Sequence, residues 1–106
     1  MKAKNTFTIL IFAALFAPFL LTSGFALNNQ ETSVFIRANV YYEQANYDEA
    51  IKQYNSILEI GWESGNLYYN LGNGYFRLGM EEKDIEILKK SAENYQKALE
   101  IDPNDK

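Results

Sequence analysis

The 106-residue sequence contains no cysteine and no histidine, and these two absences remove several kinds of chemistry. Without cysteine the chain has no disulfide, no thiol nucleophile and no zinc–thiolate site. Without histidine it lacks the commonest general base and the commonest metal ligand. Basic residues are also few. From residue 27 onward there are 8 Lys/Arg against 14 Asp/Glu, so no electrostatic footprint for nucleic acid is present.

Residues 1–26 differ in composition from the rest of the chain. Lys2 and Lys4 precede an apolar run that extends from residue 7 to residue 21, and the small residues Gly24 and Ala26 follow, two positions apart. This pattern predicts a signal peptide cleaved after Ala26, with export of the remaining domain to the periplasm or cell envelope. The alternative is an uncleaved membrane anchor, although the run is shorter than the roughly 20 residues that a span needs. Only this alternative would attach the protein to a membrane.

The domain from residue 27 to residue 106 shows helical periodicity and no strand-like alternation. Ser33 and Ser64 are expected to be N-caps, and Gly61 and Gly79 are expected to end helices. The predicted helices run from Ser33 to about Gln44, Tyr47 to Ile60, Ser64 to Leu78, and about Glu82 to Ile101. Pro103 follows the last of them and cannot continue it.

Two internal repeats follow from two different shifts of the sequence against itself. A shift of 34 aligns the first helix with the third, and a shift of 41 aligns the second helix with the fourth. The aligned pairs include Ala38 with Gly72, Tyr41 with Tyr75, Ala50 with Ser91, Tyr54 with Tyr95, and Leu58 with Leu99. The two shifts differ by seven residues, so the second repeat contains a seven-residue insertion. Seven residues are almost two helical turns, and we expect them at the start of the fourth helix.

The small and aromatic residues at these positions resemble the tetratricopeptide repeat (TPR) family of helix-turn-helix units. The segment from Asn66 to Gly79 is most similar to repeats in exported TPR proteins of bacterial aerotolerance operons. The resemblance implies an all-α fold of antiparallel helix-turn-helix repeats, with two TPR units and four helices stacked as a short superhelix. Repeat one would span about residues 31–64, and repeat two about 65–105 with the insertion.

The number of repeats bears on the oligomeric state. About three units are usually needed for a stable stack, because each unit buries its apolar face against a neighbour. With two units, the array is expected to be one unit short. The fourth helix would then either cap the stack or bind another chain, so a monomer, a homo-oligomer and a hetero-oligomer all remain open.

The resemblance implies a function as a scaffold for protein–protein interaction. In this family the first helix of each unit lines a concave groove that holds a peptide or helix of a partner. The implied groove residues are Asn39, Tyr42, Tyr69, Asn70, Asn73, Phe76 and Arg77, with Phe35, Ile36 and Glu43 on the same side. Asparagine amides can bond both polar groups of a peptide backbone, and aromatic rings offer stacking surface.

Several alternatives stand beside the groove. The asparagines could be solvated polar positions, and Trp62 is interpreted as a lid over the core rather than a partner anchor. A carboxylate clamp is not expected, because Phe35 occupies the position of a clamp lysine. We therefore expect an exported module that binds an envelope partner. The alternative is a structural fragment of a longer or split repeat protein, stable on association with another subunit.

No catalytic residue, cofactor or metal site is expected, and the chain is interpreted as not an enzyme. Its acidic residues fall on outward helical faces rather than around a pocket. Gly72 and Gly74 lie within a predicted helix, not in a phosphate-binding loop after a strand. The run from Asp102 to Asp105 lacks the central glycine and the distal glutamate of a calcium loop.

Overall fold

The computed structural model describes residues 30–104, and the predicted signal peptide lies outside this part of the chain. Residues 30–43 are helical and are called the N-terminal helix below. They are followed by α2 (Tyr47–Glu59), α3 (Gly65–Glu82) and α4 (Ile85–Ile101). No strand occurs among the described residues. The predicted all-α fold of four helices is therefore confirmed.

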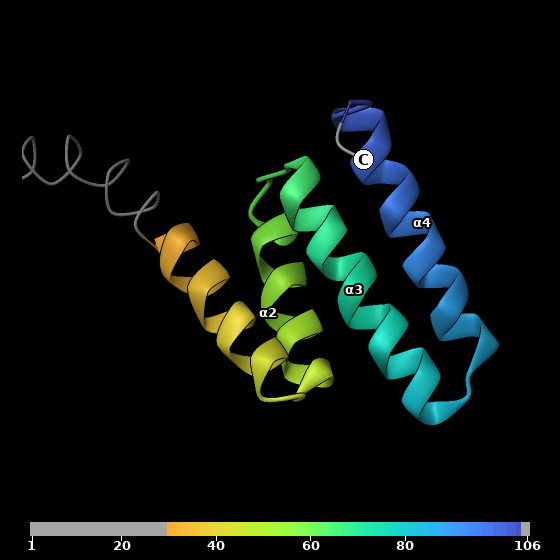
Figure 1. The fold of residues 1–106 in the computed structure, drawn as a ribbon. Coiled ribbons are helices and arrows are strands. Elements are labelled where there is room, and N and C mark those ends of the chain that lie inside the picture. Colours follow the sequence, from red (N-terminus) through yellow and green to blue (C-terminus); the bar gives the residue numbers. More distant parts are fainter. Residues whose placement is uncertain (1–29, 105–106) are drawn as a thin grey trace, which may run out of the picture. The chain divides into compact units, whose positions relative to one another are not determined.

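Consecutive helices lie side by side and run in opposite directions (Figure 1). The first turn places Ala45 in the left-handed region, at a φ of 59°, and the amide of Asn46 then bonds the carbonyl of Tyr41 at 2.9 Å. After α2, Gly61 adopts a φ of 89°, which is the conformation expected of a glycine just beyond a helix. Its predicted role at the end of α2 is confirmed.

Of the two predicted N-caps, one is confirmed and one is wrong. The Ser64 hydroxyl accepts a hydrogen bond from the Leu67 amide at 3.0 Å, which confirms it as the N-cap of α3. Ser33 is not an N-cap, because the helix already includes residue 30. The polar residues Gln30 and Glu31 are good helix formers, so nothing in this stretch favours a start at Ser33.

The predicted place of the insertion is correct only in part. Helix α3 does not stop at Gly79 but continues to Glu82, and α4 begins only at Ile85, so both helices are lengthened. A Cβ at Gly79 would lie 2.8 Å from the Leu88 side chain, so glycine is needed there for close helix packing. The left-handed residue that ends α3 is Lys83, whose amide bonds the Gly79 carbonyl.

A single core joins the N-terminal helix, α2 and α3. Its buried members are Ala38, Ala50, Ile51, Tyr54, Ile57, Leu67, Tyr68 and Leu71. Tyr54, Leu67 and Leu71 are almost completely buried, and the ring of Phe35 meets Tyr54 edge-on at 5.7 Å between centroids. The repeat tyrosines predicted to pack, among them Tyr41 and Tyr75, contact this core.

Helices α3 and α4 pack closely because small residues lie at their points of contact. A Cβ at Gly72 would lie 2.6 Å from the Tyr95 ring, so only glycine fits against it. Ser91 is 2% exposed, and its hydroxyl donates a hydrogen bond to the Gly72 carbonyl at 2.7 Å. This bond explains how a serine replaces the usual alanine, because a buried hydroxyl needs a partner.

Candidate functional site

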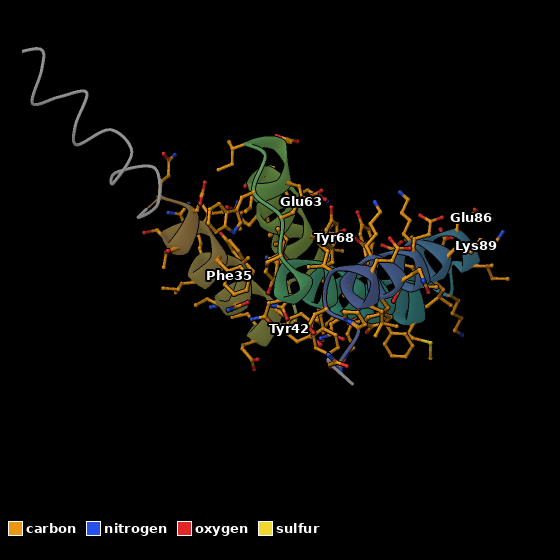
Figure 2. All side chains as sticks on the ribbon, turned by 90° about the horizontal axis from the view of Figure 1, so that it is seen from above. Phe35, Tyr42, Glu63, Tyr68, Glu86 and Lys89 are labelled. Carbon is orange, nitrogen blue, oxygen red and sulfur yellow. The ribbon has the colours of Figure 1, made fainter. Side chains whose placement is uncertain are left out.

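A cavity of about 340 Å³ opens between the two repeats. The spacing of three or four residues along each helix places these side chains on one helical face. The lining comprises Asn39, Tyr42 and Glu43 from the N-terminal helix, Tyr54 from α2, and Asn70 and Asn73 from α3. Tyr42 lies on one side of the row of helices, whereas Tyr68 and Glu63 lie on the other (Figure 2). The cavity is therefore a feature of one face.

The same hydrogen bond occurs once in each repeat. The Tyr54 hydroxyl donates to Asn39 Oδ1, and the Tyr95 hydroxyl donates to Asn73 Oδ1 at 2.5 Å. Asn39 and Asn73 are related by the shift of 34, and the two tyrosines by the shift of 41. Each bond occupies the amide oxygen, so each Asn side chain is held with its NH₂ group free to donate. Neither NH₂ group has a protein partner within residues 30–104.

Asn70 differs from the other two asparagines. It lines the cavity but makes no side-chain hydrogen bond within the described residues. Its amide therefore offers both a donor and an acceptor to whatever enters the cavity. Asn39 and Asn73 thus each offer one NH₂ donor at the cavity, and Asn70 offers an amide with no hydrogen bond of its own in this part of the chain.

Burial raises the pKa of two tyrosine hydroxyls at the site further above the neutral range. Burial raises the pKa of Tyr54 to about 12, with smaller contributions from Tyr42 and Glu43. Burial also raises the pKa of Tyr42, although the positive charge of Arg77 opposes that rise. At neutral pH both hydroxyls are neutral donors rather than nucleophilic phenolates.

Aromatic side chains lie beside the cavity on α3. Tyr69 and Phe76 are 50% and 45% exposed, and they stand four residues before and three residues after Asn73 on the same helical face. The ring of Tyr69 lies 5.7 Å from that of Tyr95. The Arg77 guanidinium lies 5.4 Å from the centroid of the Tyr47 ring, which holds a positive charge near this face.

The structure brings together four of the seven groove residues that the sequence suggested. Asn39, Tyr42, Asn70 and Asn73 line the cavity. Tyr69, Phe76 and Arg77 lie on the same helix as two of them but outside the lining. Their role in binding a partner stays a prediction.

One lining residue was missed by the sequence reasoning. Tyr54 was interpreted only as a packing residue, yet its hydroxyl reaches Asn39 in the cavity. The alignment of Tyr54 with Tyr95 was the available signal, because a buried tyrosine usually needs a partner for its hydroxyl.

Two further features concern the described residues only. They include no group of three or more acidic side chains arranged to hold a metal ion. None of their helices is both long enough and apolar enough to cross a membrane.

Comparison with known proteins adds one finding. A family model described as "Tetratricopeptide repeat" matches residues 32–60 and 75–105, more than half of the chain. The first match covers most of the N-terminal helix and all of α2, and the second covers the end of α3 and all of α4. A search of curated proteins found no match.

Proposed function

Because the chain belongs to the tetratricopeptide repeat family, whose repeats generally mediate protein–protein interaction, we propose that the face around the cavity binds a partner protein. The bound element is an extended peptide or a helix of that partner. The observation that carries the proposal is the repeated tyrosine–asparagine hydrogen bond, which leaves one NH₂ donor in each repeat unbonded within the described part of the chain, on residues that line the same cavity.

The chemistry of this face suits a peptide better than a small metabolite. The cavity is at the low end of the range for small-molecule pockets, so it has room for a side chain or a short segment. Oriented NH₂ donors fit backbone carbonyls, and the uncommitted amide of Asn70 fits either backbone group. The exposed rings of Tyr69 and Phe76 supply apolar surface of the kind that anchors protein interfaces. The repeats of this family are non-catalytic interaction modules, which also favours a protein ligand.

We propose further that the protein is exported and that its partner lies in the cell envelope. One sequence feature supports this, the signal-peptide pattern in residues 1–26. Cell fractionation followed by N-terminal sequencing tests it. An envelope protein that begins at Leu27 is expected. A cytoplasmic protein that retains Met1 would contradict export.

Binding at the cavity face is tested by capturing partners from envelope extracts with tagged protein. Asn70→Ala removes an amide that has no bond in the described part of the chain, so it should leave the fold unchanged. Asn39→Asp retains the oxygen that accepts from Tyr54 but replaces the NH₂ donor by an acceptor. We expect each change to weaken capture, and the two together to abolish it.

Asn94→Ala provides a matched control. This side chain bonds the carbonyl of Lys90 on its own helix, outside the cavity lining. The control should capture the partner as the unchanged protein does. Equal capture by the Asn39→Asp/Asn70→Ala double variant, at unchanged melting temperature, would place the binding surface elsewhere.

The second candidate function is that of a structural unit stable only on association with another subunit. It is favoured by apolar side chains left exposed on α4, where Ile85 and Leu99 are 68% and 45% exposed. In that case the protein at low concentration should lose its cooperative unfolding transition. A cooperative transition that does not depend on concentration would instead favour the independent binding module.

A further inference from the structure

The packing of α2 against α3 provides a template for what the outer face of α4 could contact. Ile51 of α2 lies against Gly74 of α3, where an added Cβ would be 3.0 Å from the Ile51 side chain. On the same side of α2, Asn55 Nδ2 donates to the Tyr75 hydroxyl at 3.2 Å. This junction therefore combines one large and one small apolar residue with one amide–hydroxyl bond.

The equivalent positions on α4 have no covering neighbour within the described residues. The shift of 41 relates Ile51 to Ala92, Asn55 to Gln96, and Leu58 to Leu99. Ile51 is buried and Leu58 is partly buried, whereas Ala92, Gln96 and Leu99 are all exposed.

The N-terminal helix carries the complementary half of the same junction. The shift of 34 relates Gly74 to Val40 and Tyr75 to Tyr41. Gly74 is buried, but Val40 is 49% exposed, and Ile36 one turn earlier is also exposed. The Tyr41 hydroxyl has no hydrogen-bond partner within residues 30–104.

The two exposed faces match in size and in polar groups. At the α2–α3 junction the large residue, Ile51, is on the second helix of a repeat and the small one on the first. Between α4 and the N-terminal helix of another copy, the small residue is on the second helix and the large one on the first, with Ala92 opposite Val40. The summed side-chain volume of this pair is therefore close to that of Ile51 with Gly74. Gln96 would stand opposite the Tyr41 hydroxyl, again an amide facing a phenol.

Charge adds a third match. Arg37 is exposed at the position where α3 has the buried Leu71. The outer face of α4 has a shallow hollow with Glu93 and Glu100 in its lining. The lysine in the same hollow, Lys97, already lies 5.4 Å from the Tyr68 ring centroid within its own chain. Neither Glu93 nor Glu100 forms a salt bridge within residues 30–104, so both can attract an arginine from another chain.

We propose that the outer face of α4 in one copy of this chain packs against residues 33–43 of a second copy, in the way that α2 packs against α3. The N-terminal helix and α4 lie at opposite ends of the row of helices (Figure 1). The contact is therefore head-to-tail, and it leaves one unoccupied face at each end of a dimer, so further copies can add. The proposal does not depend on partner binding at the cavity. The residues argued to meet in the contact are Val40 and Tyr41 of one copy and Ala92, Gln96 and Leu99 of the other, and none of them lines the cavity.

The first test is sedimentation velocity of the full chain over about 1 to 200 µM, the range in which weak self-association becomes measurable. The unchanged chain is expected to form dimers and larger species as its concentration rises. Val40→Glu blocks the N-terminal face and Leu99→Glu blocks the α4 face. Because both residues are exposed, each variant should keep the melting temperature of the unchanged chain, and each alone should remain monomeric.

Mixing the two blocked variants tests the polarity of the contact. The Val40→Glu chain keeps its α4 face and the Leu99→Glu chain keeps its N-terminal face, so an equimolar mixture should give a one-to-one dimer and nothing larger. A mixture that stays monomeric would overturn the proposal. Self-association of either blocked variant, or an unchanged chain that is monomeric at every concentration, would do the same.

A size exchange tests the residue pairing within this mixed dimer. Ala92→Ile in the first chain would oppose Val40 of the second, and this overpacking should weaken the dimer about tenfold. Adding Val40→Gly to the second chain recreates the pair that Ile51 makes with Gly74 and should restore the affinity. If Ala92→Ile left the affinity of the mixed dimer unchanged, residues 92 and 40 would not be in contact.

Discussion

The close approach of α3 and α4 at Gly72 makes Gly72→Ala an informative perturbation. The new Cβ would lie 2.6 Å from two carbons of the Tyr95 ring, whereas ordinary contacts begin near 3.4 Å. The ring or the helix must therefore move by roughly 1 Å to relieve the overlap. The Tyr95 hydroxyl is bonded to Asn73 and its ring contacts Tyr69, so movement of the ring also disturbs the cavity face.

Three terms set the magnitude, two destabilising and one stabilising. Overpacking of a well-packed contact costs about 1–3 kcal/mol, and a weakened hydrogen bond from Tyr95 adds about 0.5–1.5 kcal/mol. Alanine is favoured over glycine within a helix by about 1 kcal/mol, which acts in the other direction. We therefore expect Gly72→Ala to lower the free energy of unfolding by about 1–3 kcal/mol.

Urea denaturation followed by circular dichroism at the helix band measures this change. Gly65→Ala is the matched control, because a Cβ there would meet its nearest atoms at an ordinary 3.5 Å. The control should be as stable as the unchanged protein or slightly more so. If Gly72→Ala were equally stable, the close approach of the two helices would be refuted. In a Tyr95→Leu background the cost of Gly72→Ala should fall, since the residues that clash are coupled.

Two further predictions concern a helix start and the alkaline limit of stability. Ser64→Ala removes the hydroxyl that accepts from the Leu67 amide and should cost about 1 kcal/mol in urea denaturation; no change would argue against the cap. The pKa of Tyr54 is about 12 in the folded protein and 10.0 when unperturbed, so the stability it contributes is complete below pH 10 and is lost as the pH rises to 12. Tyr54→Phe should therefore make stability fall less steeply between pH 10 and pH 12, and parallel profiles for the two proteins would contradict this.

The helices and their order could be predicted because the repeat signal is redundant. Small and aromatic residues recur in two copies, so an error at one position does not change the fold. The precise helix ends depend on fewer residues. Gly79 looks locally like a helix stop, and only its contact with Leu88 shows that it serves close packing. The residues next to Gly79 in the sequence do not indicate such a contact between two helices.

The cavity face could be predicted in part for a similar reason. Asn39 and Asn73 occupy equivalent positions of the first helix in each repeat, so the resemblance placed both on the groove side. The tyrosine partners were harder to recognise. Tyr54 and Tyr95 match packing positions, and the pattern does not reveal where a hydroxyl at the end of a buried ring will reach. Each of these tyrosines has two roles: its ring packs between helices, and its hydroxyl bonds the amide oxygen of an asparagine.

The central claim, that the cavity face holds a partner protein, is tested most directly by photo-crosslinking in the source cells. A benzoylphenylalanine is placed at Phe76, beside the cavity, or at Lys89, an exposed residue of α4 outside the cavity lining. The account predicts a covalent adduct between position 76 and a partner protein, and this adduct disappears when Asn70→Ala is added. From position 89, one turn before Ala92, the only adduct expected is to a second copy of this chain. A partner-protein adduct from position 89 with none from position 76 would contradict the account.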